Sequence, residues 1–234
     1  MPENRNYPVG RADRILDAAG ALLVRLGYRK VTIEDIARQA DIGKGTIYLH
    51  WRTKEQLFEA LMLREFSTLL AELVDRVRAD PAEIVPHRFF RASFLAAHRR
   101  PLVTALIAGD RELLGRLLDH PLHGHDLVAK EQFYELMTRN GLVRDDIPNL
   151  AYAMEATEVG FHLAGGLHVG EGGLEPEAEA DALAHTIRHA FEPATEPPAE
   201  AVAATAAELI AIFEETAAGY QKWIYPHDPA PGPA

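Results

Sequence analysis

Apolar side chains in the first 80 residues recur at the three- and four-residue spacing of amphipathic helices. This pattern predicts a helix over residues 11–26 that stops at Gly27, and a short second helix that opens at Thr32. Thr32 is followed three residues later by Asp35, an arrangement typical of a capped helix N-terminus. A connection of three residues leads to a third helix over residues 44–50. The sequence therefore predicts two short helices joined by a tight turn after a longer one.

A fourth, long helix is capped by Thr53 together with Gln56 and continues to about Arg78. Prolines, which interrupt helices but are tolerated in their first turn, divide the remainder of the chain. Because no stretch alternates as a strand does, the expected fold is all-α. Further helices are expected to begin near Pro81, Pro101, His125, Ile147, Pro176 and Ala199, with one or two extra helical turns over residues 111–118.

The two short helices and their turn have the spacing of a helix-turn-helix, in which the second short helix enters the major groove of DNA. Ala37 supplies the small residue needed where the helices cross, and Ile42 and Ile47 point to the same small core. The outward face of the third helix is then left with side chains that can touch DNA, namely Lys44, Thr46, Tyr48, Leu49 and His50.

Charge is distributed unevenly along the chain. Of its 234 residues, 47% are hydrophobic and 25% are charged, which is ordinary for a globular protein, and the net charge of -11 argues against general affinity for nucleic acid. Residues 1–54, however, hold ten basic and six acidic side chains, a net charge of +4, which leaves -15 on the rest of the chain. The basic end is suited to approach phosphate.

Three segments near the start of the chain resemble the TetR family of bacterial transcriptional regulators. They are residues 32–37 (Thr-Ile-Glu-Asp-Ile-Ala), 43–51 (Gly-Lys-Gly-Thr-Ile-Tyr-Leu-His-Trp) and 53–57 (Thr-Lys-Glu-Gln-Leu), at the family's spacing. The sequence departs from the family's pattern at Asp41, where Gly is usual, and at Gly43, where Ser is commoner. Both departures are tolerable, because Asp visits the left-handed region more readily than most residues and Gly is an acceptable cap.

The resemblance implies roles for individual residues of this head, which covers residues 1–54 and runs into a connecting helix over residues 53–79. The partner is expected to be double-stranded DNA with a pseudo-palindromic operator, bound by a homodimer. The residues that would hold the DNA backbone are Thr32, Tyr48, His50 and Lys54, and the candidates for contact with base edges are Lys44 and Thr46.

The resemblance further implies that residues 80–224 form a helical domain that binds a small hydrophobic effector and dimerises. Apolar and aromatic side chains on three of the expected helices are candidates to line the effector pocket, with two polar residues as anchors. These candidates are Phe90, Arg91, Phe94, Phe133, Tyr134, Met137, Met154, Phe161 and His162.

Small residues at three- and four-residue spacing from Ala153 to Ala164 permit a close helix crossing, so the dimer interface is expected within residues 147–192. Residues 199–222 form an amphipathic helix that must bury one face against the body or a partner subunit. Residues 225–234, which contain four prolines, are expected to be a disordered tail.

Other classes of function have less support. The chain has no Cys and only two Ser, and it lacks both a Gly-x-Ser-x-Gly motif and a phosphate-binding loop, so we expect neither an enzyme nor a cofactor. A DNA-binding regulator without an effector, controlled by a protein partner, is the alternative, and the sequence leaves the effector, the operator and repression versus activation open. Because there is no signal-peptide pattern and no apolar run of membrane-spanning length, we expect a cytoplasmic protein without a membrane partner.

Two groups of histidines have spacings that allow metal binding. His120, His123 and His125 precede Asp126, and His185 and His189 lie one helical turn apart. We interpret the first group as part of a polar loop and the second as a solvent-facing pair, so the sequence assigns no metal ligand.

Overall fold

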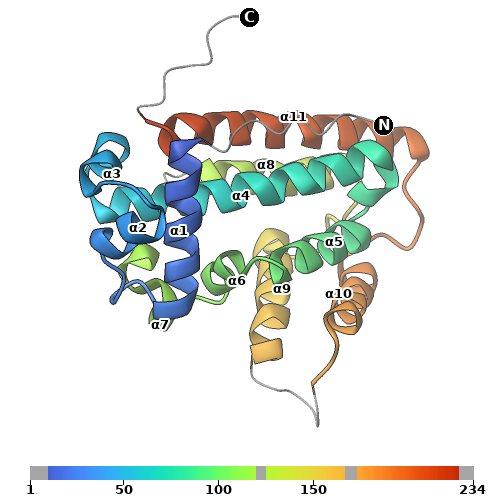
Figure 1. Ribbon diagram of the computed structural model, residues 1–234. Coiled ribbons are helices and arrows are strands. Elements are labelled where there is room, and N and C mark those ends of the chain that lie inside the picture. Colours follow the sequence, from blue (N-terminus) through green and yellow to red (C-terminus); the bar gives the residue numbers. More distant parts are fainter. Residues whose placement is uncertain (1–9, 120–124, 167–172, 227–234) are drawn as a thin grey trace, which may run out of the picture. The chain divides into compact units, whose positions relative to one another are not determined.

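The computed structural model describes residues 10–119, 125–166 and 173–226, and every regular element in these ranges is helical. The all-α expectation is confirmed for this part of the chain, and none of its helices is long and apolar enough to cross a membrane. In chain order the elements are α1 (Arg11–Leu26), α2 (Ile33–Gln39), α3 (Lys44–His50), α4 (Lys54–Ala79), the 3-10 helix η1 (Pro81–Ile84), α5 (Pro86–His98), α6 (Pro101–Ile107), α7 (Arg111–Leu114), the 3-10 helix η2 (Gly115–Asp119), α8 (His125–Arg139), α9 (Leu150–Gly166), α10 (Pro176–Phe191) and α11 (Ala199–Ile224) (Figure 1).

The chain forms two compact units. The head unit consists of the described parts of residues 1–64, 110–121 and 219–234, and the body unit consists of the described parts of residues 65–109 and 122–218. Two long helices contribute to both units, because α4 begins in the head and ends in the body, whereas α11 begins in the body and ends in the head.

The N-terminal helices begin and end where the sequence predicts. Thr32 and Asp35 form a complete capping box, in which the amide of Asp35 donates to Thr32 Oγ1 at 3.2 Å and the amide of Thr32 donates to Asp35 Oδ2 at 3.3 Å. Gly27 ends α1 with a φ of 74°, and Asp41, in the turn before α3, has a φ of 53°. Asp41 therefore adopts the left-handed conformation for which the family normally uses glycine.

The core of the head unit is made by one face of each of its first four helices. Burial of an aliphatic or aromatic side chain contributes about 2 kcal/mol, so this set supplies most of the energy that holds the short helices α2 and α3 in place. Its largest members, each at most 2% exposed, are Ile15, Leu16, Leu23, Ile36, Ile47, Trp51, Leu57, Phe58, Leu61 and Met62.

Residues 110–119 pack against the connection between α1 and α2. The amide of Tyr28 donates to the carbonyl of Leu113 at 2.8 Å, and the Tyr28 ring meets Phe58 edge-on with 5.4 Å between ring centroids. Gly115 has a φ of 54°, and a Cβ there would lie 3.2 Å from the Tyr28 ring. A segment that the sequence analysis assigned to residues 80–224 thus completes the core of the head unit.

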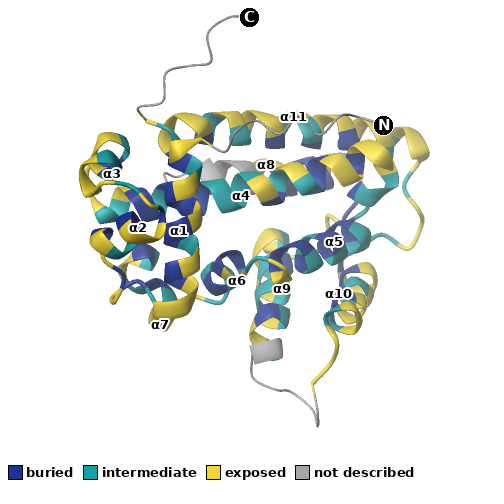
Figure 2. Cartoon of the chain, viewed as in Figure 1, coloured by how far each residue is buried: buried dark blue, intermediate teal, exposed yellow. Residues whose placement is uncertain are grey.

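The body unit is held together by aromatic side chains from α5, α8 and α11. Helix α5 packs along α10 and also contacts α9, and most of its residues are buried (Figure 2). Phe89 lies with its ring centroid 5.0 Å from that of Phe133 and 6.1 Å from that of Phe213. The predicted amphipathic helix over residues 199–222 buries its apolar face here, through Ala206, Leu209 and Phe213.

The structure corrects two of the predicted helix starts. Asp80 caps a turn of 3-10 helix at Pro81, but α5 begins only at Pro86, because Val85 before that proline is extended, with ψ of 129°. Helix α9 begins at Leu150 rather than near Ile147, because Asn149 is left-handed with φ of 53°.

The end of the chain also differs from the expectation. Tyr225, which the sequence analysis placed in the tail, is half-buried, and its hydroxyl donates to Asp13 Oδ1 at 2.6 Å. The expected disorder of residues 227–234 lies outside the described residues.

Candidate functional site

Helix α3 exposes a continuous outer face. Tyr48 is 43% exposed and Leu49 is 70% exposed, while Lys44 is exposed and Thr46 is half-buried. Ile47, on the opposite side of the same helix, is completely buried and fixes α3 to the head core. Three of the residues predicted to contact DNA, Lys44, Thr46 and Tyr48, are therefore brought together on one short helix.

Gly45 lies in the first turn of this helix, where no internal contact requires a glycine. A Cβ added at Gly45 would meet no atom within 4 Å, and its φ is not in the left-handed region. Because glycine lowers helix stability by about 1 kcal/mol relative to alanine, this residue weakens α3 without an internal benefit. Its use here leaves the backbone of α3 accessible to a close external partner.

Lys44 forms an ion pair with Glu34 of α2, and its ammonium also lies 5.9 Å from the centroid of the Tyr48 ring. The hydrogen bond from Lys44 lowers the pKa of the Glu34 carboxyl, and the same bond raises the pKa of the Lys44 ammonium. Sequence reasoning missed Glu34 as a site residue. Its signal would have been the tight turn, which brings the exposed residues of α2 close to the start of α3.

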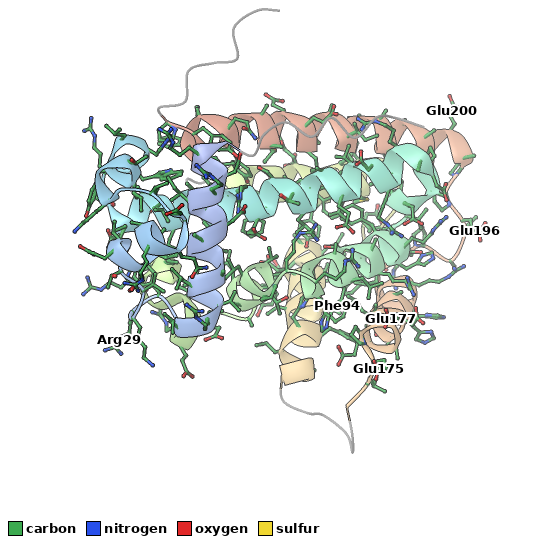
Figure 3. All side chains as sticks on the ribbon, in the orientation of Figure 1. Arg29, Phe94, Glu175, Glu177, Glu196 and Glu200 are labelled. Carbon is green, nitrogen blue, oxygen red and sulfur yellow. The ribbon has the colours of Figure 1, made fainter. Side chains whose placement is uncertain are left out.

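Thr32 and His50 flank the exposed face. Thr32 is exposed at the N-terminus of α2, and its hydroxyl donates to Asp35 Oδ2 at 2.6 Å. His50 is half-buried, with its ring centroid 5.3 Å from that of Trp51. Arg29, in the connection between α1 and α2, is exposed at the edge of the head (Figure 3).

Lys54, predicted to hold a phosphate, is tied to the interior of the head unit. Its ammonium donates to the carbonyl of Tyr28 at 2.5 Å and lies 4.2 Å from the centroid of the Tyr28 ring. Burial lowers the pKa of Lys54, and burial together with the hydrogen bond to Glu55 raises the pKa of the Tyr28 hydroxyl. Lys54 therefore positions the start of α4 against the α1–α2 connection, and its contact with phosphate stays a prediction.

Trp51, directly after α3, links that helix to the last turn of α11. Its indole N–H donates to the carbonyl of Ile224 at 3.2 Å, and both residues are buried within the head unit. Tyr220, one turn earlier on α11, is 1% exposed. Sequence reasoning missed this hydrogen bond, because 173 residues separate the two positions.

The residues predicted to line an effector pocket form the core of the body unit. Phe94 of α5 (Figure 3) stacks on His162 of α9, with 4.5 Å between the ring centroids. Phe161 is half-buried at the edge of the core, and Arg91 points outward to Asp181, whose Oδ1 accepts from Arg91 Nε at 2.6 Å. The members that are 7% exposed or less are Phe90, Phe94, Phe133, Tyr134, Met137, Met154 and His162.

His162 is the most unusual member of this set. Its side chain is 7% exposed, and its Nε2 atom is buried without a hydrogen-bond partner among the described residues. Burial, with a smaller contribution from His98, lowers the pKa of His162 to about 4. The imidazole is consequently neutral at physiological pH and keeps one nitrogen available inside the core.

Carboxylates of α9 lie near side chains of α5 and α8 in the body unit. Ser93 Oγ donates to Glu158 Oε1 at 3.4 Å. Burial first, and then the charges of Glu158 and Glu155, raise the pKa of the Tyr134 hydroxyl. The neutral hydroxyl of Tyr134 and the carboxylates on α9 therefore give an otherwise apolar region a few polar groups.

A sequence model described as bacterial regulatory proteins of the tetR family matches residues 15–61, which contain most of α1, all of α2 and α3, and the start of α4. The head of the chain is therefore of the TetR type. The resemblance inferred from residues 32–57 is thereby confirmed. The roles of individual residues in this head stay predictions.

Two curated bacterial regulators are similar to part of this chain. YhgD of Bacillus subtilis (strain 168), described as an uncharacterized HTH-type transcriptional regulator, is 38% identical over 74 residues, which are 32% of this chain and 36% of that protein. The HTH-type transcriptional repressor KstR of Mycolicibacterium smegmatis is 31% identical over 126 residues, 47% of this chain and 59% of that protein. These two matches span about a third and about three fifths of the relatives' own length.

A crystal structure of a putative tetR family transcription regulator from Shewanella sp. PV-4 resembles the chain over a greater length. The alignment covers 78% of this chain and 98% of that one, with a TM-score of 0.54 and 20% sequence identity. At this identity the likeness shows a shared fold.

The structure does not test metal binding by His120, His123 and His125. His120 and His123 lie outside the described residues, as does the side chain of His125. Over the described residues, no group of three or more His, Asp or Glu side chains is arranged to hold a metal ion.

We predict that Trp51→Phe destabilises the protein by about 1–3 kcal/mol, because the buried carbonyl of Ile224 loses its donor while the apolar ring is largely retained. The free energy of unfolding, measured by urea denaturation, tests this. Trp223→Phe is the matched control, since Trp223 is 42% exposed, and it should change stability by less than about 0.5 kcal/mol. Equal effects of the two substitutions would contradict a special role for the Trp51 bond.

We also predict a pH dependence that originates at His162. Because the folded pKa of about 4 lies below the ordinary value of 6.5, the unfolded chain binds a proton first as the pH falls. As the pH falls from 7.5 to 5, protonation of His162 in the unfolded chain should therefore lower the free energy of unfolding by about 2 kcal/mol. In His162→Phe this part of the acid-side loss should disappear, and an unchanged pH profile of the unfolding free energy would exclude it.

Proposed function

We propose that the chain is a DNA-binding transcriptional repressor that acts as a homodimer and leaves its operator when a small hydrophobic effector binds. The observation that carries the DNA-binding part is the exposed face of α3, held on a core that a family of regulatory proteins shares in sequence. Lys44 and Thr46 contact base edges, where Lys suits guanine acceptors and Thr suits a base edge or a thymine methyl. The open backbone at Gly45 supports this close approach.

Contacts with the DNA backbone come from residues around that face. Tyr48 is exposed beside Lys44, and Thr32, His50 and Lys54 lie at the helix ends that flank it. The N-terminus of α4 adds the positive end of its helix dipole, which favours a phosphate. These contacts fix the register of the protein on DNA and give affinity with little sequence information.

The Glu34–Lys44 ion pair tunes this interface. In the free protein the Lys44 ammonium is paired with the carboxylate of Glu34. When the protein binds DNA, a phosphate or a guanine replaces that carboxylate as the partner of Lys44. Exposed ion pairs contribute little stability, so the exchange costs little. The negative charge of Glu34 nevertheless repels phosphates, which reduces binding where Lys44 finds no suitable base.

Dimerisation is proposed to use residues within 147–192. On α9, Tyr152 is 75% exposed and Leu163 is 42% exposed. Between them, Ala156 and Gly160 are exposed, and a Cβ at Gly160 would meet no atom within 4 Å. This face combines large apolar side chains with a small-residue stretch, which suits a close helix crossing with a second copy. Paired heads would then read half-sites about 34–36 Å apart.

The effector is proposed to bind in the core of the body unit, where Phe94, Phe161 and Tyr134 supply aromatic surface and His162 supplies a buried nitrogen. Because α4 contributes to both units, a rearrangement of its body part is passed to the head along one continuous helix. An effector that binds the DNA-incompetent state more tightly then weakens DNA binding, and DNA weakens effector binding by the same factor.

Substitutions on α3 should separate affinity from specificity. After a site has been selected from random duplexes with the full-length protein, Thr46→Ala should flatten the base preference at one position of each half-site. Tyr48→Phe should instead lower affinity for the selected site and for unrelated DNA by the same factor of about 5, because it removes a phosphate hydrogen bond. Fluorescence anisotropy measures both affinities.

Tyr152→Phe makes the same chemical change on the exposed face of α9 and should leave DNA affinity unaltered. A specificity profile of Thr46→Ala identical to that of the unmodified protein would show that α3 does not read bases. Sedimentation that finds only monomer at micromolar concentration would exclude the proposed dimer.

The effector proposal predicts a selective loss of response in Phe161→Ala. Phe161 is half-buried, so its removal disturbs the core less than removal of the fully buried Phe94 would. With a compound found by thermal stabilisation in a library of small apolar molecules, the variant should need about tenfold more compound to leave DNA, because one aromatic contact is lost. Its operator affinity should stay within about twofold.

Leu174→Ala, at a residue that is 61% exposed and follows α9, serves as the control and should respond normally. An unchanged response of Phe161→Ala would place the effector elsewhere. If no compound in such a library weakens DNA binding, control by a protein partner becomes the better account.

A further inference from the structure

His185 and His189 form a stacked pair on the outer face of α10. Both side chains are exposed, and their ring centroids are 4.1 Å apart with an interplanar angle of 33°. The opposite face of the same helix is committed to the body core through Ala180, Leu183 and Ile187, all of them fully buried. The two imidazoles therefore stand together on the side of α10 that points away from the core.

The protonation of one of these rings is determined by the backbone. His189 Nδ1 lies 2.8 Å from the carbonyl oxygen of His185, so Nδ1 carries the proton and donates it. The neutral ring then has its lone pair on Nε2, directed outward. A backbone carbonyl that fixes the tautomer of a histidine in this way is the usual support of a metal-ligating imidazole.

The charged groups nearest to this pair on the same helix are already engaged. Asp181, one turn before His185, accepts from Arg91 at 2.6 Å. Arg188, next to His189, lies 3.8 Å from Glu196. Neither competes as a ligand, which agrees with the finding that no group of three metal-binding side chains exists among the described residues. On this face of α10, each chain thus offers two nitrogen ligands.

Two imidazoles fill half of the coordination shell of zinc, which prefers four nitrogen or sulfur ligands in tetrahedral geometry. A two-fold axis that passes close to the exposed face of α10 brings a second pair of the same residues to the first, because a symmetric interface presents the same patch from both copies. Small exposed residues at Ala178 and Ala182, on the same face of α10, allow such a close approach.

We infer that His185 and His189 of two copies together bind one divalent transition-metal ion of the zinc class across the dimer axis. This inference rests on the proposed dimer and adds a ligand that the dimer does not need in order to form. Four neutral imidazoles satisfy the ion's preference for nitrogen, and binding stabilises the dimer, since the site exists only in the assembled state.

Cobalt(II) is the probe, because its visible absorption is intense in four-coordinate sites and weak in six-coordinate ones. The experiment uses the untagged full-length chain in which His120, His123 and His125 are all replaced by Ala, so that those residues do not contribute to the count. We expect saturation at one ion per two chains with the intense absorption, displacement of cobalt by zinc, and a dimer that dissociates less in zinc than in EDTA. His185→Ala and His189→Ala should each weaken binding at least about tenfold.

His98→Gln, which changes an exposed histidine on α5, should leave the titration unchanged. Binding of one ion per chain, six-coordinate absorption, or equal binding by His185→Ala would overturn the inference. A dimer in EDTA that binds no cobalt would also overturn it while leaving the proposed function intact. A monomer both in EDTA and in zinc would instead reject the proposed dimer, and the metal bridge with it.

Discussion

The position of α3 depends on the burial of two side chains, Ile47 and Trp51. A helix of seven residues is not stable alone in water, and α3 is weakened further because Gly43 offers no side-chain cap and Gly45 lowers its helix propensity. Ile47 and Trp51 are at most 2% exposed and hold the middle and the C-terminal end of the helix against the head core. The inner face of α3 thus supplies the packing that holds the helix, and the exposed residues on its outer face are free to contact another molecule. The recognition helix is therefore stabilised by tertiary packing.

That packing uses parts of the chain far from the N-terminus. Trp51 donates a hydrogen bond to Ile224, Asp13 accepts one from Tyr225, and the amide of Tyr28 donates one to Leu113. Three buried or half-buried polar groups in the first 51 residues thus have partners in later segments. A fragment limited to residues 1–54 would leave these groups without partners and would lose the buried first turns of α4. The family's motif occupies the head, but the head reaches its full core only when the chain's last helix is present.

The sequence predicted what depends on local chemistry. The capping box at Thr32, the left-handed Asp41 and the limits of α1 and α3 follow from side chains within a few residues of each other. It did not predict the Glu34–Lys44 pair, the tie of Lys54 to Tyr28, or the Trp51–Ile224 bond, because these join residues 10, 26 and 173 positions apart. Periodicity identifies a buried face, but only the packed structure shows which polar group lies opposite it. The start of α9 was predicted wrongly for a local reason, since Asn149 is compatible both with a left-handed conformation and with a first helical turn, and the sequence does not decide between them.

The dense packing of the body core constrains how any effector could act there. Phe89, Phe90 and Phe133 lie with ring centroids 5.0 to 6.3 Å apart, and Phe94 is stacked on His162, so an added molecule must displace rings that already contact each other. Displacing these rings in the state described here breaks contacts between them, which offsets the energy gained from the effector. An effector therefore binds more tightly to a state in which α5, α8 and α9 are arranged differently. This is the unequal affinity that a shift in conformation requires, and reversal of a 1:99 equilibrium needs a difference of about 5.5 kcal/mol. Two or three newly buried aromatic contacts, together with a hydrogen bond to His162 Nε2, are of that size.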